Sequence, residues 1–402
     1  MGSYWYGAFC MHRYSIIPIF LIVLVDMLAM MMIVPLLPFY AQSFGASAVT
    51  IGFLGASFAV CQLIAAPLLG RLSDRVGRKP VLVFSQIGTL IGFILMAFAN
   101  QLWILFVARI LDGITAGNLP LAQAYIADTT PPENRAKAFG VIGVAFGIGL
   151  VVGPAFSGWL AAYSWKYPVY CAALFSLLSI FATVILLPAP TQETIDLKIQ
   201  SSPKRFWSLF SETRILNLLL QFSVFVFAFS YFAQGLGLFA QARFLNRDGK
   251  PFGPTEIGYL FAYCGVLGIF IQGWLIGKIV PRYGETRLVR IAFLCDIVGY
   301  ALLGFSTTLP LLILSCTLFS FGNSMLRPLL TSLITRNVSR EEQGGVLGVT
   351  SSLQSLGGVI TPPLGGILID TAQFTPWALV LSAGCCVGFG ISVSKNDRKL
   401  TL

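Results

Sequence analysis

The sequence predicts an all-α membrane protein with twelve transmembrane helices in two six-helix bundles. Of its 402 residues, 56% are hydrophobic and 10% are charged, with a mean hydropathy of +0.82. A soluble domain carries about 25% charged residues, so this chain lacks the polar side chains to cover a water-facing surface. Long apolar runs alternate with short polar breaks, which indicates helices; the roughly 10-residue alternating segments of a membrane β-barrel are absent.

Twelve apolar runs are each long enough, at about 20 residues, to cross a bilayer as a helix. The first is long enough to remain in the membrane rather than to serve as a cleaved signal. The composition of the last run supports a membrane span least strongly. The expected spans are 15–38, 50–69, 80–99, 102–126, 136–160, 165–188, 212–240, 255–277, 287–307, 309–334, 344–368 and 375–395.

The positive charges predict which side each break faces. If the N-terminus is inside, the inner segments hold 20 of the 26 Lys and Arg residues and the outer loops hold four. Cytoplasmic loops carry an excess of Lys and Arg, so both termini are expected in the cytoplasm. Because the cations lie in breaks between apolar runs, they do not indicate a nucleic-acid partner.

The two halves of the chain repeat, which predicts the domain organisation. A shift of 207 places Gly70 and Gly77 on Gly277 and Gly284, and a shift of 208 places Pro154 on Pro362. We expect an N-terminal bundle over 1–190, a cytoplasmic linker over 191–211 and a C-terminal bundle over 212–402. Parallel repeats of this kind are a transporter plan with substrate bound between the halves.

The segment 70–79, GRLSDRVGRK, combines four cations, one Asp and two glycines between two uncharged stretches. We expect a short cytoplasmic turn there. One interpretation is a topology signal only. The other is a gate, in which the glycines allow close helix approach, Asp74 caps a neighbouring helix, and Arg75 and Arg78 reach Asp128.

Charged residues inside membrane helices are costly and therefore indicate function. Asp26 and Asp296 are isolated acids near mid-span. Arg109 and Asp112 share a helix face, as a functional pair or as a self-neutralising structural pair. Arg327 is the fifth charge. Gln234 is a polar candidate for the substrate pocket, among aromatic residues at Phe222, Phe225, Phe229, Tyr231, Phe232, Tyr259 and Tyr263.

These motifs resemble the major facilitator superfamily over almost the whole chain. The segment 70–79 matches its pattern between helices 2 and 3, Arg109-Ile-Leu-Asp-Gly113 matches its helix 4, and residues 149–158, with Gly153 and Pro154, resemble the antiporter motif of helix 5. The last match indicates the twelve-helix drug:proton antiporters, and residues 102–160 look most like tetracycline efflux proteins.

The resemblance implies roles for particular residues. The cluster of Asp74, Arg75, Arg78 and Asp128 would hold the halves together when the transporter opens outward, and the Gly153–Pro154 region would serve coupling. Asp26 and Asp296 resemble the membrane aspartates of tetracycline exporters. Those exporters carry a further Asp in helix 3, which the stretch 87–93 of this chain lacks. Tetracycline as the substrate is therefore in doubt.

The sequence thus predicts a secondary active exporter that exchanges protons for a small lipophilic compound by alternating access. A metabolite carrier for a sugar or amino acid is the alternative, and a non-transporting scaffold or receptor is a third. No enzyme motif is visible. We expect no cofactor beyond the proton gradient, no metal, a monomer in the lipid bilayer, and location in a bacterial inner membrane.

Overall fold

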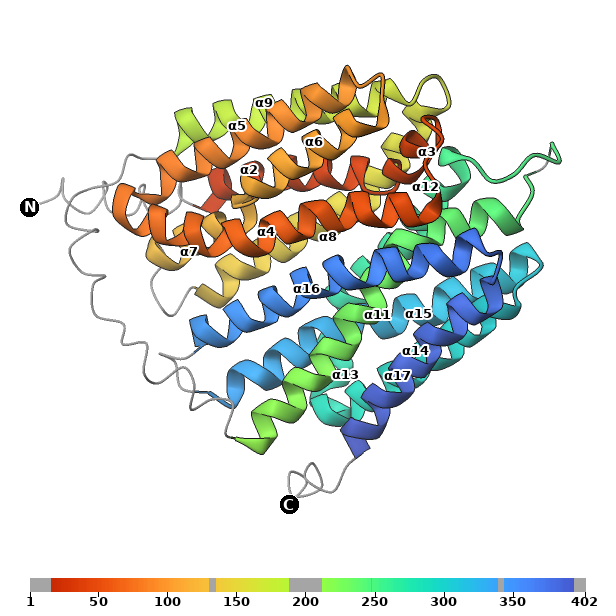
Figure 1. Ribbon diagram of the computed structural model, residues 1–402. Coiled ribbons are helices and arrows are strands. Elements are labelled where there is room, and N and C mark those ends of the chain that lie inside the picture. The colour runs from red at the N-terminus through yellow and green to blue at the C-terminus, as the bar shows by residue number, and fades with distance from the viewer. Residues whose placement is uncertain (1–15, 130–134, 188–211, 247, 339–342, 394–402) are drawn as a thin grey trace, which may run out of the picture. The chain divides into compact units, whose positions relative to one another are not determined.

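The computed structural model describes residues 16–129, 135–187, 212–246, 248–338 and 343–393, and these are almost entirely helical (Figure 1). The elements of the first half are α2 (Ile16–Ile33), α3 (Leu37–Gln42), α4 (Ala48–Val76), α5 (Arg78–Ala97), α6 (Leu102–Ile114), α7 (Asn118–Thr129), α8 (Arg135–Ala161) and α9 (Lys166–Leu186). Those of the second half are α11 (Thr213–Arg243), α12 (Pro254–Phe270), η3 (Ile271–Leu275), α13 (Ile276–Tyr283), α14 (Glu285–Phe305), α15 (Leu309–Arg336), α16 (Gln343–Asp370) and α17 (Phe374–Val393).

The described helices have the lengths and composition of membrane spans. Ten are long and apolar enough to cross a bilayer, and two shorter apolar helices, Pro18–Ile33 and Gly147–Ala161, complete a set consistent with the twelve predicted runs. The last predicted run, 375–395, corresponds to α17, which is long and apolar enough to cross a bilayer. The predicted all-α membrane fold is therefore confirmed.

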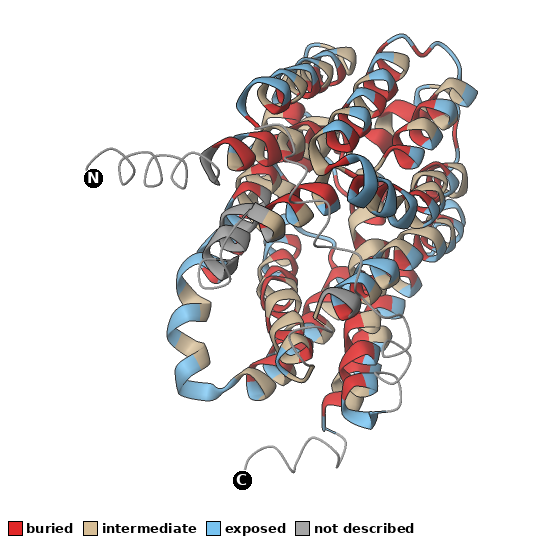
Figure 2. Cartoon of the chain, turned by 90° about the vertical axis from the view of Figure 1, so that its left-hand side faces the viewer, coloured by how far each residue is buried: buried red, intermediate tan, exposed pale blue. Residues whose placement is uncertain are grey.

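Helix α9 shows how membrane helices invert the pattern of soluble ones. Its buried face carries small and hydroxyl residues, among them Ser176, Ser179 and Thr183, whereas its exposed face carries Leu174, Phe181 and other large apolar side chains. Figure 2 shows buried and exposed residues on different sides of the helices. Lipid solvates the large apolar residues, and small residues allow helices to approach closely.

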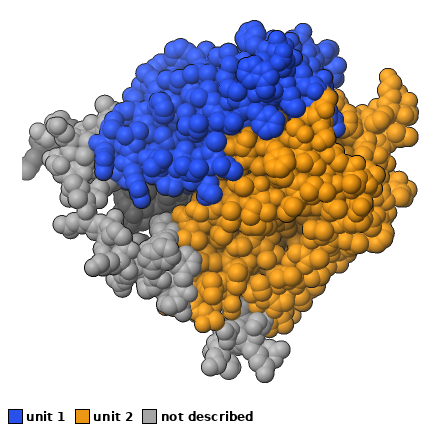
Figure 3. Space-filling view, viewed as in Figure 1, with its two compact units in different colours: residues 1–44, 60–201 blue, residues 45–59, 202–402 orange. Residues whose placement is uncertain are grey.

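The described chain forms two compact units (Figure 3). Unit 1 comprises residues 1–44 and 60–201, and unit 2 comprises 45–59 and 202–402. The first turns of α4 thus belong to unit 2, and the rest of this helix belongs to unit 1. The predicted bundle boundaries stay a prediction, because the linker 191–211 lies outside the described residues.

The internal repeat is visible in the packing of each unit. In the first half, α2 packs on α8 and α9, and α5 packs on α6 and α9; in the second half, α11 packs on α16 and α17, and α14 packs on α15 and α17. These pairs correspond helix for helix. Gly77 and Gly284, 207 residues apart, also share positive φ angles of 101° and 76°. Only glycine adopts this conformation readily, which explains why both junctions retain it.

Three local features differ from the sequence expectation. The segment 70–79 is not a turn: α4 continues to Val76, α5 begins at Arg78, and Gly77 alone separates them. The expected span 102–126 is divided into α6 and α7 at residues 115–117, where the Ser85 hydroxyl donates to the Thr115 carbonyl and accepts from the Gly117 N–H. The expected span 255–277 contains the π-helical turn η3.

Candidate functional site

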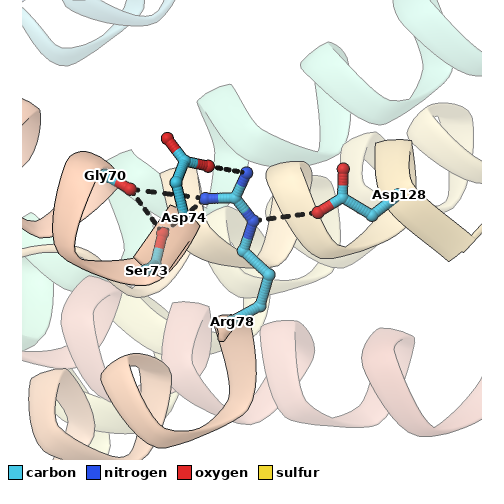
Figure 4. Close-up of polar contacts among 5 residues, drawn as sticks. All are labelled: Gly70, Ser73, Asp74, Arg78 and Asp128. Atoms are coloured by element: carbon cyan, nitrogen blue, oxygen red, sulfur yellow. Dashed lines mark hydrogen bonds and ion pairs between the residues drawn. The ribbon is translucent and has the colours of Figure 1, made fainter. Parts of the chain in front are cut away.

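Arg78 is the centre of a polar cluster at the junction of α4 and α5 (Figure 4). Its Nε donates to Asp128 Oδ2 of α7 at 2.9 Å, and its Nη2 lies 2.5 Å from Asp74 Oδ1 of α4. Its Nη1 donates to the Gly70 carbonyl at 3.4 Å and to the Ser73 hydroxyl. The planar guanidinium therefore connects three helices of unit 1 through one side chain.

The residues predicted for the gate differ in burial and in their contacts with Arg78. Arg78 contacts Asp128 as expected, and both side chains are largely buried, at 15% and 16% exposure. Asp74 is half exposed and pairs with Arg78. Arg75 is exposed. Participation of Arg75 and Asp74 in gating stays a prediction.

The second half contains a counterpart of this ion pair with the charges exchanged. Glu285 and Arg336 correspond to Arg78 and Asp128 by shifts of 207 and 208, and Arg336 Nη1 lies 3.4 Å from Glu285 Oε2. Ser332 donates to the other carboxylate oxygen at 2.8 Å. Arg336 is 73% exposed, so solvent screens this pair far more than the first. Both halves thus contain the ion pair, with the acidic and the basic residue exchanged.

Arg109 and Asp112 form an ion pair within α6, as their spacing predicts. Arg109 Nη1 lies 2.8 Å from Asp112 Oδ2, and both residues are 8% exposed. Thr89 of α5 hydrogen-bonds to the Asp112 carboxylate. Gly92 of α5 gives Asp112 room, because a Cβ at Gly92 would lie 3.3 Å from that of Asp112.

Asp26 of α2 hydrogen-bonds to the side chains of Gln86 of α5 and Ser179 of α9. Gln86 Nε2 donates to Asp26 Oδ2 at 3.4 Å and to Ser179 Oγ at 2.8 Å. Gln86 and Ser179 are fully buried, whereas Asp26 is partly exposed. Asp112 acts on Asp26 electrostatically, so the two acids lie in one region of unit 1. The third predicted membrane span, which is α5 in the structure, therefore contributes the amide of Gln86. This residue lies one position before the stretch 87–93 that lacks an Asp.

Asp296 of α14 is enclosed by α15, and only 1% of the residue is exposed. The Asn323 backbone N–H donates to its carboxylate, and Asp296 Oδ1 has no hydrogen-bond partner among the described residues. A Cβ at Gly322 would overlap this oxygen, so the absent side chain leaves room for the carboxylate. Nearby, Asn323 Nδ2 donates to the Tyr300 hydroxyl at 2.8 Å.

The remaining polar candidates of unit 2 lie on different helices. Arg327 of α15 donates to Gln354 of α16 at 2.6 Å. Gln234 of α11 lies against Gly55, at 3.2 Å from the position of a Cβ there. Most aromatic candidates pack inside the unit: Tyr231 stacks on Trp377, and Phe232 packs on Tyr300 and Phe319.

Gly153 and Pro154 lie on α8 where this helix packs against α2. A Cβ at Gly153 would lie 2.7 Å from the Cβ of Met31, and one at Gly149 would lie 3.0 Å from that of Met27. Pro154 lies inside the helix. The glycines are therefore required for close packing against α2. A role in coupling stays a prediction.

Asp370, at the end of α16, was missed by the sequence analysis. Its carboxylate accepts hydrogen bonds from the backbone N–H groups of Ala48 at 2.7 Å and Val49 at 3.0 Å, at the start of α4. Helix N-termini favour negative charge and leave their first N–H groups without partners within the helix. The first turns of α4 pack closely on α16, since a Cβ at Gly366 would lie 2.5 Å from the Ala48 carbonyl oxygen.

Comparison with known proteins identifies the fold and the family. The family model described as Major Facilitator Superfamily matches residues 19–362 and 276–398. The tetracycline resistance protein, class H, of Pasteurella multocida is 32% identical over 363 residues, covering 87% of this chain and 88% of that protein. Multidrug resistance protein 2 of Bacillus subtilis is 30% identical over 395 residues, covering 94% of each.

A solved structure agrees with these matches. The crystal structure of the human organic anion transporter MFSD10 superimposes with a TM-score of 0.73 and 25% identity, covering 95% of this chain and 99% of that one. The chain is therefore a multi-pass integral membrane protein of the Major Facilitator Superfamily, related to its drug antiporters, and it is a transporter rather than an enzyme.

Proposed function

We propose that this protein exports a small lipophilic compound in exchange for protons, by alternating access in a bacterial plasma membrane. Both termini would lie in the cytoplasm, the proton gradient would supply the energy without a cofactor, and one chain would suffice. The names of the relatives, which concern resistance to tetracycline and to multiple drugs, support the substrate class.

The contrast between paired and unpaired acids is the observation that carries the proposal. Asp112 and Asp128 each pair with an arginine. Within the described residues, Asp26 and Asp296 form no ion pair; their partners are the neutral groups described above. A carboxylate at membrane depth without a cation is costly, and a bound proton removes that cost. These two acids are therefore the candidate proton carriers.

The polar groups of the site favour a lipophilic substrate over a sugar or amino acid. The hydrogen-bond partners of Asp26 are one amide and one hydroxyl, and that of Asp296 is one backbone N–H, whereas a carrier of a hydrophilic metabolite needs several convergent donors and acceptors. An aromatic and aliphatic environment with isolated acids suits a lipophilic compound, including a cationic one.

Everted membrane vesicles test the proposal. A proton gradient should drive uptake of a fluorescent lipophilic dye into vesicles that contain the protein, and a protonophore should abolish it. Asp26→Asn or Asp296→Asn should remove gradient-driven uptake while retaining downhill exchange. Asp248→Asn, which changes an exposed loop acid, serves as the control. Normal gradient-driven uptake by both membrane variants would refute the proposal.

A further inference from the structure

We propose that Gln86 is a positioning residue for Asp26, with an amide that hydrogen-bonds to this acid in both its charged and its proton-bearing state. The inference rests on the proposed function, in which Asp26 gains and loses a proton. Gln86 lies one residue before the stretch 87–93, which lacks the Asp that tetracycline exporters carry in their third membrane helix.

Hydrogen bonds with α9 hold Gln86 in place beside Asp26. Its Nε2 donates to Ser179 Oγ at 2.8 Å and to Asp26 Oδ2 at 3.4 Å, and Ser179 Oγ lies 3.3 Å from the Ile22 carbonyl one turn before Asp26. Ser176 Oγ, one turn earlier on α9, lies 3.4 Å from the backbone carbonyl of Gln86. Contacts from α9 thus orient both the backbone and the side chain of this residue.

The amide oxygen of Gln86 makes no hydrogen bond to the described residues, and this observation points to a second, protonated state of Asp26. Gln86 is fully buried, and its Oε1 has no hydrogen-bond partner among the described residues. A buried acceptor without a partner is costly. The Nε2 side matches a carboxylate, which only accepts hydrogen bonds. A protonated carboxyl group has an O–H donor, and the free Oε1 of the same amide is the acceptor that it requires.

An amide can satisfy both states of a neighbouring acid, because it carries both a donor and an acceptor. Arg or Lys at this position would serve only the carboxylate, and a charged Asp or Glu would serve only the protonated form. Rotation about the last side-chain bond exchanges Nε2 and Oε1. The only covalent change is at Asp26, where the O–H bond forms when a proton is taken up and breaks when the proton is released.

The surroundings of Asp26 add one further charge. Asp112 of α6 acts on it electrostatically and is itself paired with Arg109. Helix α8 presents Gly149 to α2, and α7 contributes Tyr125 to the adjacent core. Gln86 and Ser179 are therefore the neutral groups whose removal changes Asp26 without altering a nearby charge.

The experiment compares pH profiles of gradient-driven dye uptake in everted vesicles. Gln86→Leu removes the donor and the acceptor while retaining the approximate volume. The midpoint of the profile should move to higher pH by about one unit, because the hydrogen bond lost by the charged carboxylate is stronger than the one lost by the protonated carboxyl group. In the Asp26→Asn background, which retains downhill exchange, Gln86→Leu should cause no further change in that exchange or in its pH profile, since Gln86 acts through that acid.

Two serines on one face of α9 give a matched pair if Gln86→Leu fails to fold. Ser179→Ala removes a hydroxyl that holds the amide and also hydrogen-bonds to Asp26, whereas Ser176→Ala removes a buried hydroxyl that donates to the backbone carbonyl of Gln86. Ser179→Ala should move the midpoint in the same direction by about half a unit, and Ser176→Ala should not. Identical profiles for both variants and the wild type would overturn the inference.

The outcomes separate this inference from the proposed function. If Asp26→Asn abolishes coupled uptake but Gln86→Leu and Ser179→Ala retain the wild-type midpoint, Gln86 has no positioning role and the proposed function stands. If Asp26→Asn retains uptake with an unchanged pH profile, Asp26 carries no proton, and the function assigned to this acid fails independently of Gln86.

Discussion

The exchanged ion pairs of the two halves lead to a quantitative prediction about stability. Arg78→Met and Asp128→Asn, alone and combined, remove the pair of unit 1. Arg336→Met and Glu285→Gln do the same in unit 2. A double-mutant cycle on each pair isolates the coupling between its two residues from their other contacts.

The expected magnitudes follow from exposure and hydrogen bonding. Arg78 and Asp128 are 15% and 16% exposed and are joined by a 2.9 Å charge-assisted hydrogen bond. Such bonds contribute about 1.5–3 kcal/mol, so we expect a coupling of about 2 kcal/mol. Arg336 is 73% exposed, and its pair with Glu285 is longer, at 3.4 Å. Exposed pairs contribute about 0.2–1 kcal/mol, so the second coupling should be below about 1 kcal/mol.

Thermal unfolding of the purified variants in one detergent measures both couplings, with relative values taken from shifts in Tm at matched ionic strength. Raising the salt concentration should weaken the pair of unit 2 more than that of unit 1, because exposed charges are screened. Equal couplings in the two halves, or a larger one for Glu285 and Arg336, would show that burial does not set the strength of these contacts.

Three further predictions concern other contacts. Asp370→Asn should reduce stability by about 1 kcal/mol, the usual contribution of a capping carboxylate, and should increase hydrogen exchange at the start of α4; unchanged exchange would contradict the capping role. Arg109→Ala should cost about 3–5 kcal/mol by leaving Asp112 buried without its cation, and adding Asp112→Asn should restore part of this loss in detergent unfolding; strictly additive losses would mean that the two do not interact. Gly153→Ala should lower Tm through a loss of about 1–3 kcal/mol because its Cβ would overlap Met31, whereas Gly384→Ala, at a site with open space, should not; equal shifts would refute the packing argument.

The membrane helices and the Arg109–Asp112 pair were predictable from the sequence because each depends on one local property. Apolar runs of sufficient length mark spans. Residues three apart on a helix lie on one face, which predicts that Arg109 and Asp112 meet. Gly77 and Gly284 share a positive φ, in agreement with the repeat. This conformation strongly favours glycine, so a glycine at matching positions in the two halves is recognisable in the sequence.

The contacts between distant segments were not predictable. Gln86 and Ser179 are ordinary polar residues within apolar runs, and no local pattern indicates that they meet Asp26. Asp370 and Ala48 are 322 residues apart. A carboxylate at the end of one helix gives no sign of which N-terminus it caps. The exchanged pair in the second half could have been found by applying the repeat shift to Arg78 and Asp128.

The expected turn at 70–79 was wrong for a physical reason. Charge marks where the chain leaves hydrocarbon, but it does not end a helix. Arg and Leu are good helix formers, so α4 continues past the membrane boundary until Gly77. The helical end of α4 also sets Gly70, Ser73 and Asp74 on the side where Arg78 contacts all three.

Proton flux through the purified protein in sealed liposomes tests the central claim most directly. With no proton gradient imposed, a gradient of a lipophilic substrate should drive proton movement in the opposite direction, recorded by a pH-sensitive dye trapped in the lumen. The flux should vanish in Asp26→Asn or Asp296→Asn liposomes that still exchange substrate. Substrate movement by the wild-type protein without any proton flux would contradict the account.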